Sequence, residues 1–280
     1  MGDIHRYLRE YYMPHIWCPG CGHGIILGAV LRAIDAAGLD QNNVAVVSGI
    51  GCASRAPGYL DFCTLHTTHG RALPFATGLK MIRPDMKIVV VTGDGDTAAI
   101  GGNHLIHAAR RNIDITTVVF NNSIYGMTSG QYSPMTPTSR FATTAPYGNL
   151  ERPFDLCTLA SAAGATYVAR STAYHVRQLT TYIGRGLAHK GFSFIEAVSQ
   201  CPTYYGRRNR LGAAPVMLEW QKRNSISIEQ AKDLEPAERE DKIVTGEFVN
   251  QNVPEYTEVY AALIGRLGSS GSSGGNDSGR

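Results

Sequence analysis

The chain has 280 residues and a formal charge of +3. This length fits one large domain with appendages and a sizeable core. The charge is spread along the chain without a basic block, which argues against a nucleic-acid partner. Residues 1–12 carry charges and no apolar run, so we expect no signal peptide. No apolar segment approaches the ~20 residues that cross a bilayer, which excludes a membrane protein and favours a cytoplasmic one.

Apolar, β-branched runs alternate along the chain with segments of helical periodicity, which predicts an α/β fold: a mostly parallel sheet with helices on both faces. Residues 5–17 are expected to lie across a surface or a partner, and residues 125–147 to form a long ordered loop. We expect helices over residues 25–37, 154–163 and 174–187, one that ends at residue 81 and one that includes residues 105–110. We expect strands over residues 44–48, 64–68, 114–120, 166–169 and 192–198, and one that begins at residue 87.

The chain divides by composition into three parts. Residues 1–211 carry the periodic pattern and the motifs, and residues 212–267 form a charged, less periodic extension that we expect to pack on the domain or on a partner. Residues 268–280 are rich in Gly and Ser, which predicts a disordered tail.

Two predicted strands end in residues that suit a magnesium ion. The strand from residue 87 ends at Asp94, between two glycines, and the next strand ends before Asn122. The carboxyl ends of parallel strands line the crevice where ligands bind. A carboxylate oxygen of Asp94, an amide oxygen of Asn122 and the carbonyl oxygen of Ile124 form a set that Mg²⁺ prefers, shared with waters and phosphates.

In this chain, Gly93-Asp94-Gly95 is followed one βαβ unit later by Asn121-Asn122. This pattern resembles the thiamine diphosphate motif. The alternative is an ordinary turn with a capping aspartate and an Asx turn. Asp96 is also a candidate N-cap of the helix through residues 105–110.

The six cysteines favour metal or redox chemistry over disulfides in a cytoplasmic chain. Cys18 and Cys21 have the C-x₂-C spacing that lets two thiolates reach one metal. Cys52 and Cys201 follow predicted strands, so four sulfurs could converge, and spacing alone leaves zinc and an iron–sulfur cluster open. Cys63 and Cys157 are expected to be small buried hydrophobic residues.

Taken together, the motifs resemble the β subunit of 2-oxoacid:ferredoxin oxidoreductases, most of all the two-subunit 2-oxoglutarate enzymes. The likeness covers residues 12–211 and includes Cys18-Pro-Gly-Cys21-Gly, Ile50-Gly51-Cys52, Gly-Asp-Gly-Asp, Asn-Asn-Ser-Ile-Tyr-Gly-Met and Cys201-Pro202. It implies one [4Fe–4S] cluster on Cys18, Cys21, Cys52 and Cys201, and Mg²⁺ on Asp94, Asn122 and the Ile124 carbonyl. It also implies contacts with thiamine diphosphate from Ile50, Gly51, Cys52, Ala53, His69, Gly95, Asp96, Gly126 and Met127.

The same resemblance implies oxidative decarboxylation of 2-oxoglutarate with coenzyme A to succinyl-CoA and CO₂, or the reverse, with ferredoxin as the electron partner. It further implies an α subunit, in a dimer of αβ pairs, because this chemistry needs a glutamate at the aminopyrimidine. Glu10, Glu151 and Glu196 do not stand in a matching context.

Arg55 and His69 are the candidate catalytic residues. A dicarboxylate substrate needs a cation, and Arg55 follows Cys52 on a turn that faces the crevice, with Arg71 as the runner-up. His66 and His69 could instead be ordinary core histidines. The alternative functions are a β subunit for pyruvate or another 2-oxoacid, a non-oxidative thiamine diphosphate decarboxylase or synthase, and a zinc-stabilised binding subunit without chemistry.

Overall fold

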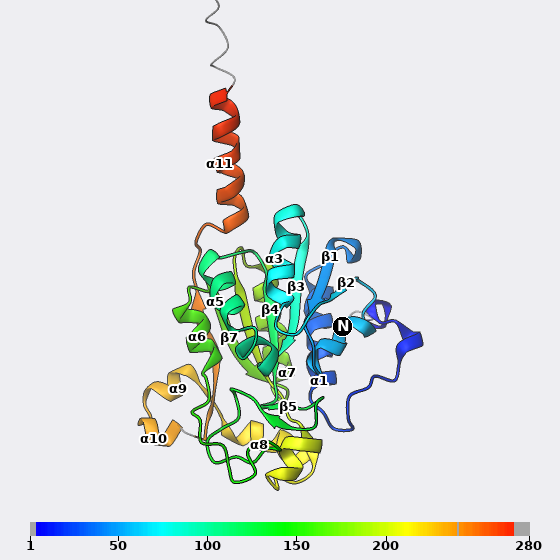
Figure 1. The fold of residues 1–280 in the computed structure, drawn as a ribbon, viewed down its shortest axis with the longest axis vertical. Coiled ribbons are helices and arrows are strands. Elements are labelled where there is room, and N and C mark those ends of the chain that lie inside the picture. Colours follow the sequence, from blue (N-terminus) through cyan, green and yellow to red (C-terminus); the bar gives the residue numbers. More distant parts are fainter. Residues whose placement is uncertain (1–3, 240, 272–280) are drawn as a thin grey trace, which may run out of the picture.

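The structure, a computed structural model, describes residues 4–239 and 241–271. Its centre is an eight-stranded sheet in the order β2-β1-β3-β4-β8-β7-β10-β9 (Figure 1). The strands are β1 Val44–Ser48, β2 Cys63–His66, β3 Lys87–Gly93, β4 Thr116–Asn121, β7 Tyr167–Thr172, β8 Ser193–Val198, β9 Ser225–Ser227 and β10 Ile243–Asn250. A separate hairpin joins β5 Ile124–Tyr125 to β6 Gln131–Tyr132.

The sheet is mostly parallel, as the sequence predicts. Each strand in the row β2-β1-β3-β4-β8-β7 runs parallel to its neighbour, and β9 runs parallel to β10. Within this sheet, the pairing of β10 with β7 is antiparallel. Every residue of β1 and β4 is buried, because helices cover both faces of the central strands. The parallel register brings the carboxyl ends of β1, β3 and β4 to one edge of the sheet.

Helices pack on both faces of this sheet. On one face, α1 (His23–Ala36) and α7 (Val176–Ala188) supply Ile26, Ile34 and Leu179 to a buried cluster. On the other, α3 (Ala72–Ile82), α5 (Gly102–Arg111) and α6 (Leu156–Ala162) supply Leu73, Leu105 and Leu156 to a second cluster. The remaining helices are α2 Ala56–Tyr59, α4 Asp94–Ala98, α8 Ala214–Asn224, α9 Ile228–Lys232, α10 Pro236–Arg239 and α11 Tyr256–Gly271.

The segment beyond residue 211 is partly built into the domain. Strand β10 pairs with β7 and so extends the sheet, whereas α11 projects away from it, opposite the end that carries β5 and α8 (Figure 1). Helix α11 reaches Gly271, four residues into the predicted disordered tail, and residues 272–280 lie outside the described residues. Among the residues that the structure describes, no helix is both long and apolar enough to cross a membrane.

The opening segment and the predicted loop are both ordered by specific contacts. Tyr7 and Trp17 are buried against the domain, while Tyr11 is 92% exposed. The loop over residues 125–147 contains the β5–β6 hairpin, and its turns are held by backbone hydrogen bonds such as that from the Thr143 N–H to the Gly130 carbonyl. These segments therefore present a fixed surface beside the carboxyl edge of the sheet.

Candidate active site

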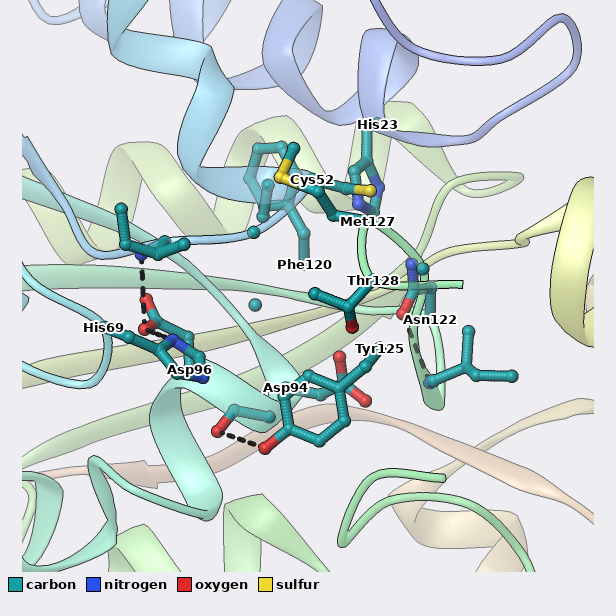
Figure 2. Close-up of a pocket in the computed structure, with 17 residues that line it drawn as sticks. His23, Cys52, His69, Asp94, Asp96, Phe120, Asn122, Tyr125, Met127 and Thr128 are labelled. Carbon is teal, nitrogen blue, oxygen red and sulfur yellow. Dashed lines mark hydrogen bonds and ion pairs between the residues drawn. The ribbon is translucent and has the colours of Figure 1, made fainter. Parts of the chain in front are cut away.

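A cavity of about 140 Å³ opens at the carboxyl ends of β1, β3 and β4 (Figure 2). Complete ligand pockets are usually roughly 300–1,000 Å³, so this cavity is small for a whole coenzyme. Most of the residues that line it come from the segments directly after the strands, whereas His23 belongs to α1 and Gly93 and Phe120 to β3 and β4. The full lining is His23, Ile50, Gly51, Cys52, Ala53, His69, Gly93, Asp94, Gly95, Asp96, Phe120, Asn122, Ile124, Tyr125, Gly126, Met127 and Thr128.

The three predicted magnesium ligands share this cavity. Asp94 begins α4 directly after β3 and is 3% exposed, and Ser133 Oγ donates a 2.5 Å hydrogen bond to Asp94 Oδ2. Asn122 and Ile124 follow β4 in a tight turn, in which the Ile124 N–H donates to Asn122 Oδ1 at 3.3 Å. Ser123 has a φ of +59° and reverses the chain between them.

Burial raises the pKa of Asp94 to about 7, although the Ser133 hydroxyl partly opposes this. A divalent cation at this position would favour the ionised carboxylate. The set contains only oxygen donors: one carboxylate, one amide and one carbonyl. The donor chemistry thus fits Mg²⁺.

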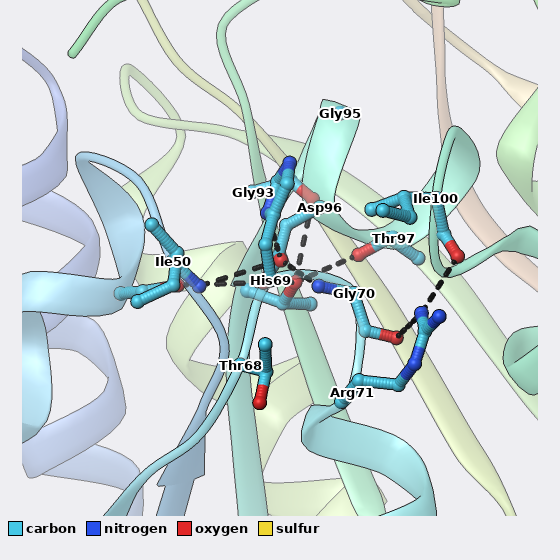
Figure 3. Close-up of polar contacts among 12 residues, drawn as sticks. Ile50, Thr68, His69, Gly70, Arg71, Gly93, Gly95, Asp96, Thr97 and Ile100 are labelled. Atoms are coloured by element: carbon cyan, nitrogen blue, oxygen red, sulfur yellow. Dashed lines mark hydrogen bonds and ion pairs between the residues drawn. The ribbon is translucent and has the colours of Figure 1, made fainter. Parts of the chain in front are cut away.

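Asp96 organises three ligand-facing turns rather than capping a later helix (Figure 3). Its Oδ1 accepts from the Gly70 N–H at 2.5 Å and contacts His69 Nδ1 at 2.6 Å, and its Oδ2 accepts from Thr92 Oγ1 at 2.8 Å. The Ile50 N–H is 3.4 Å from Oδ1. The turns after β1, β2 and β3 are therefore joined at one carboxylate.

The predicted N-cap role of Asp96 is wrong. Helix α5 begins after Gly101 and has no side-chain cap, while Asp96 lies inside the short helix α4. Because a carboxylate only accepts hydrogen bonds, the proton of the His69 ring sits on Nδ1, which leaves Nε2 as the nitrogen that can serve a ligand.

The turn after β2 needs a glycine at position 70. Gly70 has a φ of +69°, and a Cβ there would lie 2.5 Å from Ile100 Cγ2 and 2.8 Å from the Gly101 nitrogen. A side chain would push this turn away from Asp96. The backbone N–H of Gly70 can therefore reach the carboxylate only because the residue is small.

The four predicted cluster cysteines lie near one another beside the cavity. A methyl group placed on Gly126 would be 3.4 Å from Cys52 Sγ and 3.8 Å from Cys201 Sγ. The pKa of Cys21 is raised to about 12, chiefly by burial and in smaller part by Cys201, Cys52 and Cys18. Burial, followed by Cys201 and Cys18, likewise raises the pKa of Cys52 to about 11.

Two contacts tie the segments that carry these thiols together. Trp17 Nε1 donates a 2.7 Å hydrogen bond to the Cys52 carbonyl, which links the Cys18–Cys21 segment to the turn after β1. The Gly22 N–H donates to the Gln200 carbonyl, next to Cys201, at 3.3 Å. Thiols gathered in this way, with pKa values raised by burial and by one another, fit a cationic metal centre that would stabilise their thiolates.

No group of three or more His, Cys, Asp or Glu side chains within residues 4–239 and 241–271 is arranged to hold a metal ion. The four cysteine thiols are therefore not gathered tightly enough in the structure to surround one metal ion. The three proposed magnesium ligands could not form such a group, because Asp94 is the only one of them that is a His, Cys, Asp or Glu.

Several predicted residues lie away from the cavity. Arg55 is exposed on the 3-10 turn η4 (Ala53–Arg55) and does not line the cavity. Arg71 Nη1 donates to the Ile100 carbonyl at 3.1 Å, and His66 Nδ1 lies 3.0 Å from Ser48 Oγ, again outside the lining. Cys157 is buried as predicted, but the prediction for Cys63 is wrong, because the edge strand β2 leaves it exposed.

Other lining residues carry no assignment from the sequence. His23 is 1% exposed, its Nδ1 lies 3.1 Å from Ser199 Oγ, and burial lowers its pKa to about 3. Its place two residues after Cys21, the second cysteine of the C-x₂-C pair, was the available signal. Tyr125 OH donates to the Gly95 carbonyl at 3.2 Å, so the hairpin closes over the turn after β3.

A buried ion network supports Asn121, which precedes the magnesium turn. Asn121 Nδ2 donates to Glu196 Oε1 at 2.7 Å, and Arg170 Nε donates to Glu196 Oε2 at 2.7 Å. Asn121 Oδ1 accepts from the Ser123 N–H at 3.0 Å. Glu196 is thus a structural carboxylate behind the site, not a group that reaches the cavity.

The comparisons with known proteins agree with this geometry. The family model "Thiamine pyrophosphate enzyme, C-terminal TPP binding domain" matches residues 49–197. The 2-oxoglutarate synthase subunit KorB of Methanothermobacter thermautotrophicus is 55% identical over 92% of this chain and 91% of its own, and that of Methanocaldococcus jannaschii is 54% identical over 94% and 97%. A solved 2-oxoglutarate:ferredoxin oxidoreductase from Magnetococcus marinus, with 2-oxoglutarate, coenzyme A and succinyl-CoA bound, has a TM-score of 0.85 and 36% identity over 95% of this chain and 91% of that one.

The fold and the lining of the cavity define a thiamine diphosphate enzyme, since the matched family model spans the turns after β1, β3 and β4 that build the cavity. Within that class, the chain belongs to the family of 2-oxoglutarate synthase KorB subunits.

Proposed function

We propose that this chain is the thiamine diphosphate-binding β subunit of a 2-oxoglutarate:ferredoxin oxidoreductase. The reaction is the oxidative decarboxylation of 2-oxoglutarate with coenzyme A to succinyl-CoA and CO₂, or its reverse. The observation that carries the proposal is that one cavity is lined by every residue named above for the coenzyme and for Mg²⁺. The KorB relatives and the Magnetococcus marinus enzyme support the choice of substrate.

Thiamine diphosphate, when bound, supplies the carbanion chemistry that removes CO₂ from a 2-oxoacid. Asp94, Asn122 and the Ile124 carbonyl would hold Mg²⁺ on the diphosphate at the carboxyl ends of β3 and β4. Asp96 fixes the turns that carry Ile50 and His69, so both are set before the coenzyme binds. Gly126 and Met127 line the same cavity, on the turn that follows β5.

Cys18, Cys21, Cys52 and Cys201 would hold one [4Fe–4S] cluster next to this cavity. Conversion of a 2-oxoacid anion and coenzyme A to an acyl-CoA and CO₂ releases one proton and two electrons. A cluster takes electrons one at a time, so each turnover reduces two ferredoxin molecules by one electron each. Iron–sulfur potentials in proteins span roughly −700 to +450 mV, which includes the low values this transfer needs.

The site is incomplete in this chain. Among the described residues no glutamate lines the cavity, and the cavity itself is small for the coenzyme. An α subunit would supply the glutamate and the rest of the walls, in a dimer of αβ pairs. We infer a cytoplasmic location, and the six cysteines, all free in the structure, support it because reducing compartments keep thiols unpaired.

The test is a panel of 2-oxoacids assayed anaerobically with the reconstituted αβ pair, coenzyme A and ferredoxin. The proposal predicts the highest kcat/KM for 2-oxoglutarate and no turnover by the β chain alone. A preference for pyruvate would reassign the substrate, and CO₂ release without reduction of ferredoxin would indicate a non-oxidative decarboxylase or synthase. Steady turnover by the single chain would contradict the need for an α subunit.

A further inference from the structure

The two segments that carry Cys18, Cys21 and Cys201, and the loop that packs beside Cys201, contain no acidic residue. Residues 11–34, 126–150 and 197–218 hold neither Asp nor Glu, although the whole chain has 23 such residues. The same segments hold five arginines: Arg32 in the first, Arg140 in the second, and Arg207, Arg208 and Arg210 in the third. The charge on this side of the thiols is therefore one-sided, whereas on the cavity side the Asp94 carboxylate acts on Cys52.

Apart from Arg32, these arginines lie on chain that packs directly over Cys201. The π-helical turn η5 (Pro202–Gly206) follows Cys201, and the Gly206 N–H donates to the Cys201 carbonyl at 2.8 Å. Arg207, Arg208 and Arg210 come next, and all three are exposed. The positive charges thus begin within a few residues of a predicted cluster ligand.

The loop that carries Arg140 is held against the same turn. A Cβ on Gly130 would lie 3.0 Å from the ring of Tyr204, and the Phe141 N–H donates to Asn209 Oδ1 at 2.8 Å. Arg208 Nη2 lies 3.4 Å from Thr143 Oγ1. The two arginine-bearing segments therefore form one continuous surface beside Cys201, which we call the arginine surface (Arg140, Arg207, Arg208 and Arg210).

The charges of the arginine surface are not neutralised within the described chain. Among the described residues, none of the four guanidinium groups has a carboxylate within 4.0 Å. The acidic groups at its margin are Asp241, which acts on Tyr205, and Glu151, which accepts a hydrogen bond from Tyr132 OH. Unpaired surface charge of one sign attracts a partner of the opposite sign and accelerates its association.

We propose that the arginine surface docks a small acidic electron-carrier protein. The proposal rests on the proposed function, because it places the acceptor of the one-electron transfer next to the thiols that would hold the cluster. One electron leaves the reduced cluster and reduces the oxidised carrier, with no bond made or broken. A protein acceptor needs such an orienting surface, whereas a small viologen dye does not.

The test is the double charge reversal Arg207→Glu with Arg208→Glu in the reconstituted αβ enzyme. The matched control is Arg110→Glu with Arg111→Glu, an exposed pair in the last turn of α5 that changes the net charge by the same amount at the opposite edge of the sheet. Binding of an acidic 2[4Fe–4S] ferredoxin is measured by interferometry at low and high salt. Turnover is measured with that ferredoxin and with methyl viologen.

The proposal predicts that the Arg207/Arg208 variant raises the Kd and the KM for ferredoxin about 10-fold or more at low salt, with a smaller effect at high salt. Its kcat with methyl viologen and its KM for coenzyme A stay at the unmodified values, and the control pair changes none of these quantities. Unchanged ferredoxin binding would overturn the proposal. An equal loss of turnover with methyl viologen would also overturn it. A raised KM for coenzyme A would overturn it as well, because it would assign the arginines to binding of the coenzyme's phosphates. No viologen reduction by the unmodified enzyme would instead refute the proposed function.

Discussion

Replacement of Asp96 tests whether this carboxylate assembles the cavity or only contacts the coenzyme. In Asp96→Ala the Gly70 N–H and the His69 ring lose hydrogen bonds of 2.5 and 2.6 Å, and Thr92 loses one of 2.8 Å. Each bond to a charged group contributes about 1.5–3 kcal/mol, and losses at one centre are not additive. We therefore expect the free energy of unfolding to fall by about 3–5 kcal/mol. Asp96→Asn keeps a carbonyl oxygen for the Gly70 N–H, so we expect a loss of about 1–2 kcal/mol.

The assay is denaturant unfolding of both variants together with titration of thiamine diphosphate in the presence of Mg²⁺. The structure predicts that stability and coenzyme affinity fall together and that Ala is worse than Asn in both, because the turns that carry Ile50, His69 and Gly95 would no longer be joined. If Asp96 served only to contact the coenzyme, affinity would fall while stability stayed unchanged. That result, or equal effects of Asn and Ala, would refute the reasoning.

Three further predictions address other parts of the chain. Lys80→Met leaves the buried Asp114 without its partner at 2.7 Å, so we expect the free energy of unfolding, measured by heat or denaturant, to fall by about 3–5 kcal/mol. The control is Lys190→Met, an exposed lysine 3.9 Å from the same carboxylate, for which we expect a loss of under about 1 kcal/mol. Equal losses in the two variants would contradict this prediction. Arg55 lies outside the cavity of this chain, so a role in substrate binding requires walls that the α subunit adds; Arg55→Ala is then expected to raise the KM for 2-oxoglutarate more than that for pyruvate, and equal changes would remove the specificity role. Chelation of divalent metal with EDTA should release thiamine diphosphate, as measured by coenzyme fluorescence after filtration, and Mg²⁺ should restore binding; retention of the coenzyme would argue against the Asp94 site.

The sequence was most informative where a residue's role depends on its near neighbours. The apolar runs before Ser48 and Asp94 are typical of buried parallel strands, and in the structure they form β1 and β3, two neighbouring interior strands of the sheet. Since the carboxyl ends of parallel strands share one edge, the acidic and amide residues that follow them could be assigned to one cavity. The residues that line the cavity agree with that assignment.

Roles that depend on contacts between distant segments could not be predicted in this way. The neighbouring sequence alone suggests Asp96 as a cap of the helix through residues 105–110, whereas its partner Gly70 is 26 residues away in the turn after β2. Strand β10 carries no strong strand signal, and its antiparallel pairing with β7 depends on the edge that β7 leaves open. Cys63 is exposed because its strand lies at the sheet edge, and sequence spacing does not report strand order.

The metal content of the anaerobically purified αβ enzyme tests the central claim most directly, because the account requires the thiols of Cys18, Cys21, Cys52 and Cys201 to bind iron beside the coenzyme cavity. Four iron and four acid-labile sulfide per chain are expected, and both should be lost in Cys201→Ala while Cys63→Ala keeps them. One zinc per chain, or no metal other than magnesium, would contradict the account.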